Sequence, residues 1–174
     1  ATNTTYYWWV RSVCGATDKS VWISGGNFTT TQVPATLPYA QDFTTNNDFG
    51  FTNGTYNNKW NYGTATGNTG GSLYISNDNG ATNSYDINNQ ATVHAYRDIT
   101  IPAGATTAIF SYDWKGQGES TYDYLRVWLV PTTYTPTAGT LITAGTGRIQ
   151  VGADYNNLQS NWTNYTNPTL NISS

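Results

Sequence analysis

Residues 92–101 read TVHAYRDITI, and this stretch decides the fold class. The apolar residues of one face are Val93, Ala95, Ile99 and Ile101. A period of two predicts a half-buried β-strand, because successive side chains of a strand point to opposite faces. Arg97 is the one misfit on that face, since it places a charge among core positions.

Similar short runs lie on both sides of this stretch. Further strands are expected around Leu73 and Ile75, at Phe110, Tyr112 and Trp114, at Leu125, Val127 and Leu129, and at Ile149 and Val151. Turn dipeptides such as Asn53-Gly54 and Gly70-Gly71 separate the runs, and no credible helix lies between them. This spacing predicts an all-β fold, an antiparallel β-sandwich or barrel.

The composition supports a folded, exported β-protein. The 174 residues are 37% hydrophobic and only 10% charged, against about 25% charged in an average globular domain. The seven Lys and Arg residues are scattered singly, so nucleic acid is not expected as a partner. No window approaches 18 apolar residues, so membrane insertion is not expected either.

A composition break at residues 29–38, TTTQVPATLP, predicts a domain boundary formed by an extended linker or an entering edge segment. Residues 1–31 are therefore expected to be one partial module and residues 32–174 a second domain. Two strands are expected upstream, at 5–14 and 21–29, and two strands cannot make a stable domain alone. The start at Ala1 and the absence of Met suggest an excised piece of a longer polypeptide. Cys14 is expected to be a small buried hydrophobe or to have its disulfide partner elsewhere in the parent.

Two segments carry a resemblance to known families. The strand ending in VRSVC at 10–14, with SVW at 20–22 and FTT at 28–30, resembles the last strands of a fibronectin type III module. From Leu37 onward the chain resembles the MAM-like jelly rolls, also called choice-of-anchor J or cleaved-adhesin domains, of secreted Bacteroidetes proteins. The segments that carry this second resemblance are LP at 37–38, QDF at 41–43, DF at 48–49, GGSLYIS at 70–76, AYRDI at 95–99, FSYDWKGQGE at 110–119 and YDYLRV at 122–127.

The second resemblance implies a jelly-roll topology, cell adhesion and an extracellular or cell-surface location. It also implies that the domain is truncated at its C-terminus, because no segment like Asp-Asn-Ile closes it. In the resembled family, acidic residues at the domain entrance and in a Gly-Glu-x-x-x-Asp block often coordinate calcium. This makes Asp42, Glu119 and Asp123 the candidate calcium ligands.

The residues themselves leave the metal question open. Nine of the ten acidic residues are Asp, mostly beside Asn and Gly in polar loops, and such oxygen donors suit a hard cation. Hydrogen bonding at strand ends without any metal explains the same residues equally well. Asp48 and Asp78 are weaker candidates, and the loop 77–80 is expected to be an ordinary solvated turn.

Aromatic residues are in surplus, with 7 Trp, 14 Tyr and 5 Phe. Exposed aromatic rings stack on the apolar faces of sugars, so some are candidates for glycan binding. The candidate ligand-binding residues are Trp60, Tyr62, Trp128 and Trp162. Ordinary packing inside the sheet or between domains is the competing interpretation.

Catalysis is not expected. A glycosidase would need two carboxylates flanking a substrate, and nothing in the spacing singles out a pair among Asp113, Glu119 and Asp123. A Ser-His-Asp triad would need His94, the only His, but no Gly-x-Ser-x-Gly elbow is present.

The expected function is a non-catalytic adhesion or ligand-binding module of a larger secreted protein. The expected partners are glycans or cell-surface proteins, together with neighbouring domains of the same chain. The alternative is a structural spacer or an accessory domain of a secreted hydrolase or peptidase. A binding module predicts exposure of Trp60, Trp128 and Trp162, whereas a spacer predicts burial of Trp128 and Trp162.

Overall fold

A computed structural model describes residues 5–156 and 159–173, which form strands and no helix. The strands are β1 (Thr5–Val10), β2 (Ile23–Thr29), β3 (Ala35–Thr36), β4 (Gly50–Thr52), β5 (Lys59–Gly63), β6 (Ser72–Ser76), β7 (His94–Tyr96), β8 (Ile99–Thr100), β9 (Thr107–Gly116), β10 (Leu125–Leu129), β11 (Ile149–Tyr155) and β12 (Gln159–Asn171). The all-β prediction is therefore confirmed, and the arrangement fits a β-sandwich. None of the described residues lies in a helix that could cross a membrane.

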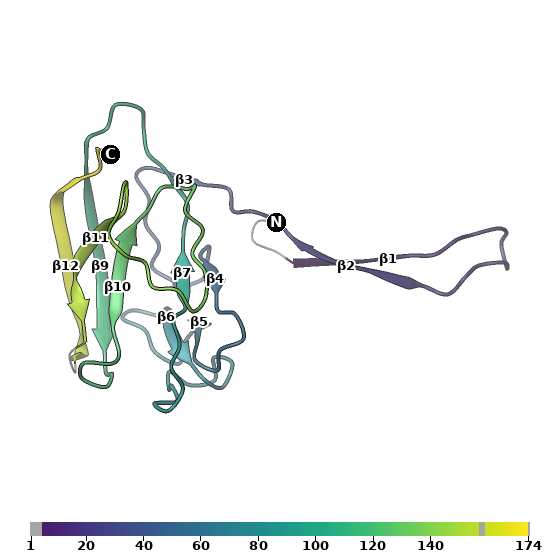
Figure 1. Cartoon of the computed structure of the whole chain (residues 1–174), viewed down its shortest axis with the longest axis horizontal. Coiled ribbons are helices and arrows are strands. Elements are labelled where there is room, and N and C mark those ends of the chain that lie inside the picture. The colour runs from purple at the N-terminus through teal and green to yellow at the C-terminus, as the bar shows by residue number, and fades with distance from the viewer. Residues whose placement is uncertain (1–4, 157–158, 174) are drawn as a thin grey trace.

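The strands pair two by two. The antiparallel pairs are β1 with β2, β4 with β7, β5 with β6, β9 with β12 and β10 with β11, and β3 pairs with β8 in parallel. In Figure 1, strands β9 to β12 lie together on one side of the body and β4 to β7 on the other. The β1–β2 hairpin extends away from both groups.

The strand β9 has the alternation that the sequence predicts. Phe110, Tyr112 and Trp114 are half-buried, whereas Ser111 and Asp113 between them are exposed. The Tyr112 hydroxyl lies 3.2 Å from the carbonyl oxygen of Val151 on β11 and 2.9 Å from the hydroxyl of Tyr155. Val151 is only 1% exposed, so this aromatic face and β11 form part of the core.

The strand β6 buries a different face from the one that its apolar residues suggest. Ser72, Tyr74 and Ser76 are buried, while Leu73 and Ile75 are only half-buried. The buried polar atoms are satisfied locally, because the Tyr74 hydroxyl donates to the carbonyl of Gly80 at 2.7 Å and the Ser76 hydroxyl donates to a loop carboxylate. Apolar content alone does not reveal which face of such a strand is inside.

The prediction of one continuous strand over 92–101 is wrong. The stretch forms β7 and β8, and Arg97 and Asp98 lie between them outside any strand. The Arg97 side chain turns toward Asp48, and the backbone N–H of Asp98 donates to the side chain of Gln32 instead of to a strand partner. The misfit in the pattern therefore marks the point at which the strand breaks.

The segment 29–38 docks on the body as an edge strand, the second of the two expected forms. The strand β3 pairs with β8, and Gln32 just before it is buried. Upstream, β1 and β2 form the expected hairpin, in which Gly25 is an extra residue between the partners of Trp8 and Trp9. The expectation of a buried Cys14 is wrong, because this thiol is free and exposed at the tip of the hairpin.

Candidate functional site

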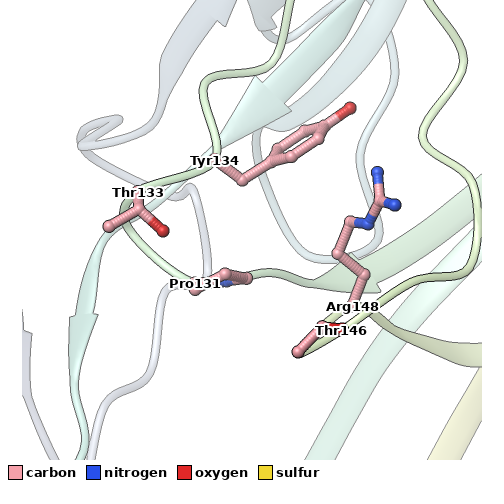
Figure 2. A pocket seen from close by; sticks show the side chains of 5 residues that line it. All are labelled: Pro131, Thr133, Tyr134, Thr146 and Arg148. Atoms are coloured by element: carbon pink, nitrogen blue, oxygen red, sulfur yellow. The ribbon is translucent and has the colours of Figure 1, made fainter.

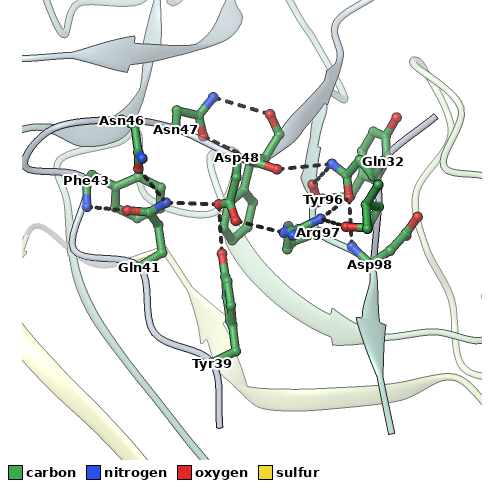
Figure 3. Close-up of polar contacts among 12 residues, drawn as sticks. Gln32, Tyr39, Gln41, Phe43, Asn46, Asn47, Asp48, Tyr96, Arg97 and Asp98 are labelled. Atoms are coloured by element: carbon green, nitrogen blue, oxygen red, sulfur yellow. Dashed lines mark hydrogen bonds and ion pairs between the residues drawn. The ribbon is translucent and has the colours of Figure 1, made fainter. Parts of the chain in front are cut away.

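A polar network joins the segment before β3 to the loop before β4 and to the break after β7 (Figure 3). The Arg97 guanidinium forms an ion pair with Asp48 at 3.0 Å, with the two side chains 12% and 35% exposed. Arg97 also donates to the side-chain oxygen of Gln32 and to the carbonyl of Val33. The Asp48 carboxylate receives further hydrogen bonds from Tyr39 at 2.8 Å and from Gln41 at 3.0 Å.

This network keeps Asp48 ionised. Burial alone would raise the pKa of Asp48, but the hydrogen bonds from Gln41 and Tyr39 and the charge of Arg97 outweigh it and lower that pKa. Burial and the hydrogen bond to Asp48 together raise the pKa of the Tyr39 hydroxyl to about 12. Because these polar groups bond one another, the network holds the three segments together.

The candidate calcium ligands cap loops. Asp42 is exposed and accepts a hydrogen bond from the backbone N–H of Thr44 at 2.9 Å. Asp123 accepts from the hydroxyl of Tyr85 at 2.6 Å and from the backbone N–H of Glu119 at 2.7 Å. Glu119 and Asp123 are thus neighbours in one loop, whereas Asp42 belongs to another.

The described part of the chain has no group of three or more His, Cys, Asp or Glu side chains that could hold a metal ion. The oxygen atoms of Asp123 help to close the loop between β9 and β10. The assignment of Asp42, Glu119 and Asp123 as calcium ligands stays a prediction.

Asp78 organises the turn after β6. Its carboxylate accepts hydrogen bonds from the hydroxyl of Ser76 at 2.6 Å and from the backbone N–H and hydroxyl of Thr82 at 3.0 and 2.7 Å. These hydrogen bonds lower the pKa of Asp78 to about 2, and the bond from Ser76 has the largest effect.

A pH titration followed by NMR at the Asp78 carboxyl carbon should therefore have its midpoint at about 2, the lowered pKa of this carboxyl. Ser76→Ala removes the largest influence and should raise this pKa toward that of a free carboxyl. Thr82→Ala keeps the backbone N–H bond and should raise it less. A midpoint near 4 in the unaltered chain, the usual value for Asp, would contradict the observed turn.

Three of the four aromatic candidates are integrated into the body. Trp60 is half-buried, and its indole N–H donates to the carbonyl of Val93 at 3.1 Å. Tyr62 packs against Phe43, with 6.4 Å between the ring centroids. Trp128 is half-buried on β10, opposite Gln150 of β11. None of these three rings is among the strongly exposed aromatic side chains, and neither is the half-buried ring of Trp162.

Trp162 has different surroundings, on the outward face of the β9–β12 pair. Its indole N–H donates to the carbonyl of Gly67 at 3.1 Å, and the Lys115 ammonium lies 5.4 Å from the ring centroid. On the same face, the Asp113 carboxylate accepts hydrogen bonds from the side-chain amides of Asn68 at 2.7 Å and Asn164 at 2.8 Å. We call Asn68, Asp113, Lys115, Trp162 and Asn164 the Trp162 face.

Most of the Trp162 face could not be identified from local sequence. Asn68 and Asn164 come from distant parts of the chain, and only the pairing of β9 with β12 and the loop after β5 bring them to Asp113. Of the five residues of this face, only Trp162 was predicted to bind a ligand, on the basis of its residue type.

Two other surfaces were not predicted as sites. The hairpin exposes a cluster of aromatic rings around a hollow of about 580 Å³ lined by Tyr7, Trp8, Trp9 and Trp22. A second hollow, of about 340 Å³, lies in the loop between β10 and β11, where Tyr134 and Arg148 face each other with 5.4 Å between the guanidinium carbon and the ring centroid (Figure 2).

The groups weighed for catalysis lie in separate surroundings. The Nε2 atom of His94 is 3.1 and 3.0 Å from the carbonyl oxygens of Thr137 and Thr140, so it ties a loop to β7. Asp113 belongs to the Trp162 face, whereas Asp123 belongs to the loop of Tyr85 and Glu119. Comparison with known proteins adds no assignment, because no family model, no curated protein and no solved structure matches the chain.

Proposed function

We propose that the chain is a non-catalytic extracellular adhesion or ligand-binding module that binds glycans on the Trp162 face. The observation that carries the proposal is a half-buried indole fixed beside a carboxylate and two carboxamides on an outward sheet face.

The chemistry of these groups suits a sugar. The apolar face of a pyranose packs on an aromatic ring, and its hydroxyls need donors and acceptors around that ring. Asn68 and Asn164 each use one amide hydrogen to hold Asp113. Asn68 therefore keeps a second N–H and a carbonyl oxygen for a ligand. Asn164 keeps its second N–H, whereas its side-chain oxygen already accepts a hydrogen bond from the Thr166 hydroxyl at 2.7 Å. Because the indole N–H is bound to Gly67, the ring orientation is set before a ligand arrives, which reduces the entropy cost of binding.

The wider parts of the proposal are a jelly-roll topology of the MAM-like type, attachment to a larger secreted parent, and stabilisation by calcium. The paired β-strands of the body and the aromatic and amide-rich surface support the first two. For calcium, the support is the family resemblance and the Asp-rich loops, although the three candidate ligands are not gathered in one place.

Co-sedimentation with a panel of insoluble polysaccharides tests the proposal. The unaltered chain should bind at least one matrix, and Trp162→Ala should weaken that binding at least about tenfold, the loss expected for one stacking contact of 1.4 kcal/mol or more. Trp22→Ala is the matched control, because it removes an exposed indole from the hairpin and should leave retention unchanged. Equal losses in both variants would show non-specific adsorption and contradict the assignment of the site.

The same assay separates the remaining alternatives. Repeating it with a chelator tests the calcium contribution, since loss of binding without calcium supports an ion that orders the loops. A spacer or accessory role is favoured by the packing of Trp60 against the backbone of residue 93. Absence of retention on every matrix would overturn glycan binding and leave that structural role.

A further inference from the structure

The β1–β2 hairpin exposes apolar side chains on both of its faces. Tyr7, Trp9, Trp22 and Phe28 are each more than half exposed, and Trp8 nearly so. The three charged residues of the hairpin, Arg11, Asp18 and Lys19, all lie in its tip, so neither strand carries a charge. A two-stranded hairpin is at best marginally stable in water, so pairing with further strands would stabilise this one.

The two free edges of the hairpin are not equivalent. The strand β2 contains Gly25 and Gly26, with a register shift opposite Trp8 and Trp9 and a φ of 97° at Gly26. A bulge of this kind bends the strand and interrupts its outer edge. The strand β1 is an unbroken run of six residues, TYYWWV, without Gly, Pro or charge. Natural edge strands are normally protected by such residues, so β1 is the edge that is open to another strand.

The chain exposes more surface to solvent than a compact monomer of the same mass, and the excess is large enough for a protein interface. The chain exposes 11346 Å², whereas a compact monomer of this mass would expose about 8400 Å². The excess of about 2900 Å² is larger than the roughly 800 Å² that each partner contributes to a standard interface. A small ligand such as a sugar would leave the backbone groups of the β1 edge unpaired.

We infer that two copies of the chain associate through β1, edge to edge and antiparallel, to form a four-stranded sheet in the order β2, β1, β1 of the second copy, β2 of the second copy. A two-fold axis near Tyr7 and Trp8 places aromatic residues opposite aromatic residues, a favourable cross-strand pairing. The same surface meets itself, as a closed symmetric dimer requires. No like charges meet along the shared edge, because β1 carries none.

The mass of the full chain in solution tests this inference. Light scattering under reducing conditions, which exclude a disulfide through Cys14, should give twice the 19.1 kDa of one chain at micromolar concentration. Tyr7→Lys adds a charged side chain to the strand β1 of each copy and should weaken the dimer at least about tenfold, because charged side chains on an edge strand, Lys above all, oppose the addition of another strand. Val21→Lys makes a similar change at a residue that is 79% exposed and outside β1, and it should leave the dimer intact.

A distance measurement tests the geometry separately. Cys14 is the only cysteine and is exposed, so it accepts a spin label. In the antiparallel pair the two labels lie at opposite ends, roughly 40 Å apart, from a rise of 3.4 Å for each residue between the midpoint of β1 and Cys14. A monomer at these concentrations, equal behaviour of the two lysine variants, or a label distance below about 20 Å would overturn the inference. The Trp162→Ala assay has no part in this test, so the two proposals can fail independently.

Discussion

Arg97→Ala is expected to lower the free energy of unfolding by about 2–3 kcal/mol. The substitution leaves the Asp48 carboxylate without its counter-ion and removes the donor to the side chain of Gln32. Losing one member of a fully buried ion pair costs about 3–5 kcal/mol, and the smaller figure allows for the partial exposure of Asp48. Denaturant unfolding monitored by circular dichroism measures the loss.

Arg126→Ala is the matched control for this prediction. Arg126 forms a two-pronged ion pair with Asp154 at 2.8 Å, but the two side chains are considerably more exposed than those of Arg97 and Asp48. An exposed pair contributes about 1 kcal/mol or less. Similar losses in the free energy of unfolding for the two variants would show that the network around Arg97 stabilises the fold no more than an exposed ion pair does.

The same network makes the stability of the fold depend on pH. The pKa of Asp48 is lower in the folded chain than in the unfolded chain, so the unfolded state takes up the proton first as the pH falls. The contribution of this carboxylate is therefore complete above the unfolded pKa of about 4 and is lost as the pH falls through the folded pKa. Asp48→Asn should flatten that part of the stability profile.

Gly152→Ala is expected to destabilise the fold by about 3 kcal/mol or more, through two independent effects. Gly152 has a φ of 85°, which an L side chain adopts only with strain. A β-carbon there would also lie 2.3 Å from the hydroxyl oxygen of Tyr155 and 2.6 Å from that of Tyr112. The substitution would therefore force apart the tyrosine pair that joins β9 to β11.

Gly104→Ala separates these two effects. Its φ is 80°, close to that of Gly152, but a β-carbon at this position meets nothing within 4 Å. It should cost only about 1 kcal/mol, the price of the backbone conformation. Thermal unfolding of both variants measures the difference, and equal losses would show that the tyrosine pair adapts freely.

The sequence predicted strands well where one face is apolar and the other polar over several residues. Phe110, Tyr112 and Trp114 fell on one face as expected, because the alternation of β9 is regular. The prediction failed at Arg97, where a contact with a residue 49 positions away overrides the local pattern. It was also incomplete at β6, where hydrogen bonds to a following turn allow serines to be buried.

The candidate site was predictable only in its residue types. Trp162 could be selected because exposed indoles suit sugars, but its neighbours could not. Asn68 reaches Asp113 across 45 residues of chain, and no local pattern reports such a contact. The exposure of the aromatic side chains at residues 6–9 depends on the position of the hairpin outside the body, which no local pattern reports.

The side chain of Gln32 also has a mechanical consequence. It bonds the backbone carbonyls of Asp48 and Tyr96 through its nitrogen, and the side chain of Arg97 and the N–H of Asp98 through its oxygen. The chain then continues directly into the short β3–β8 pair. Tension applied through the hairpin would pass in part through this carboxamide, which spreads the load over two separate segments, 48 and 96–98.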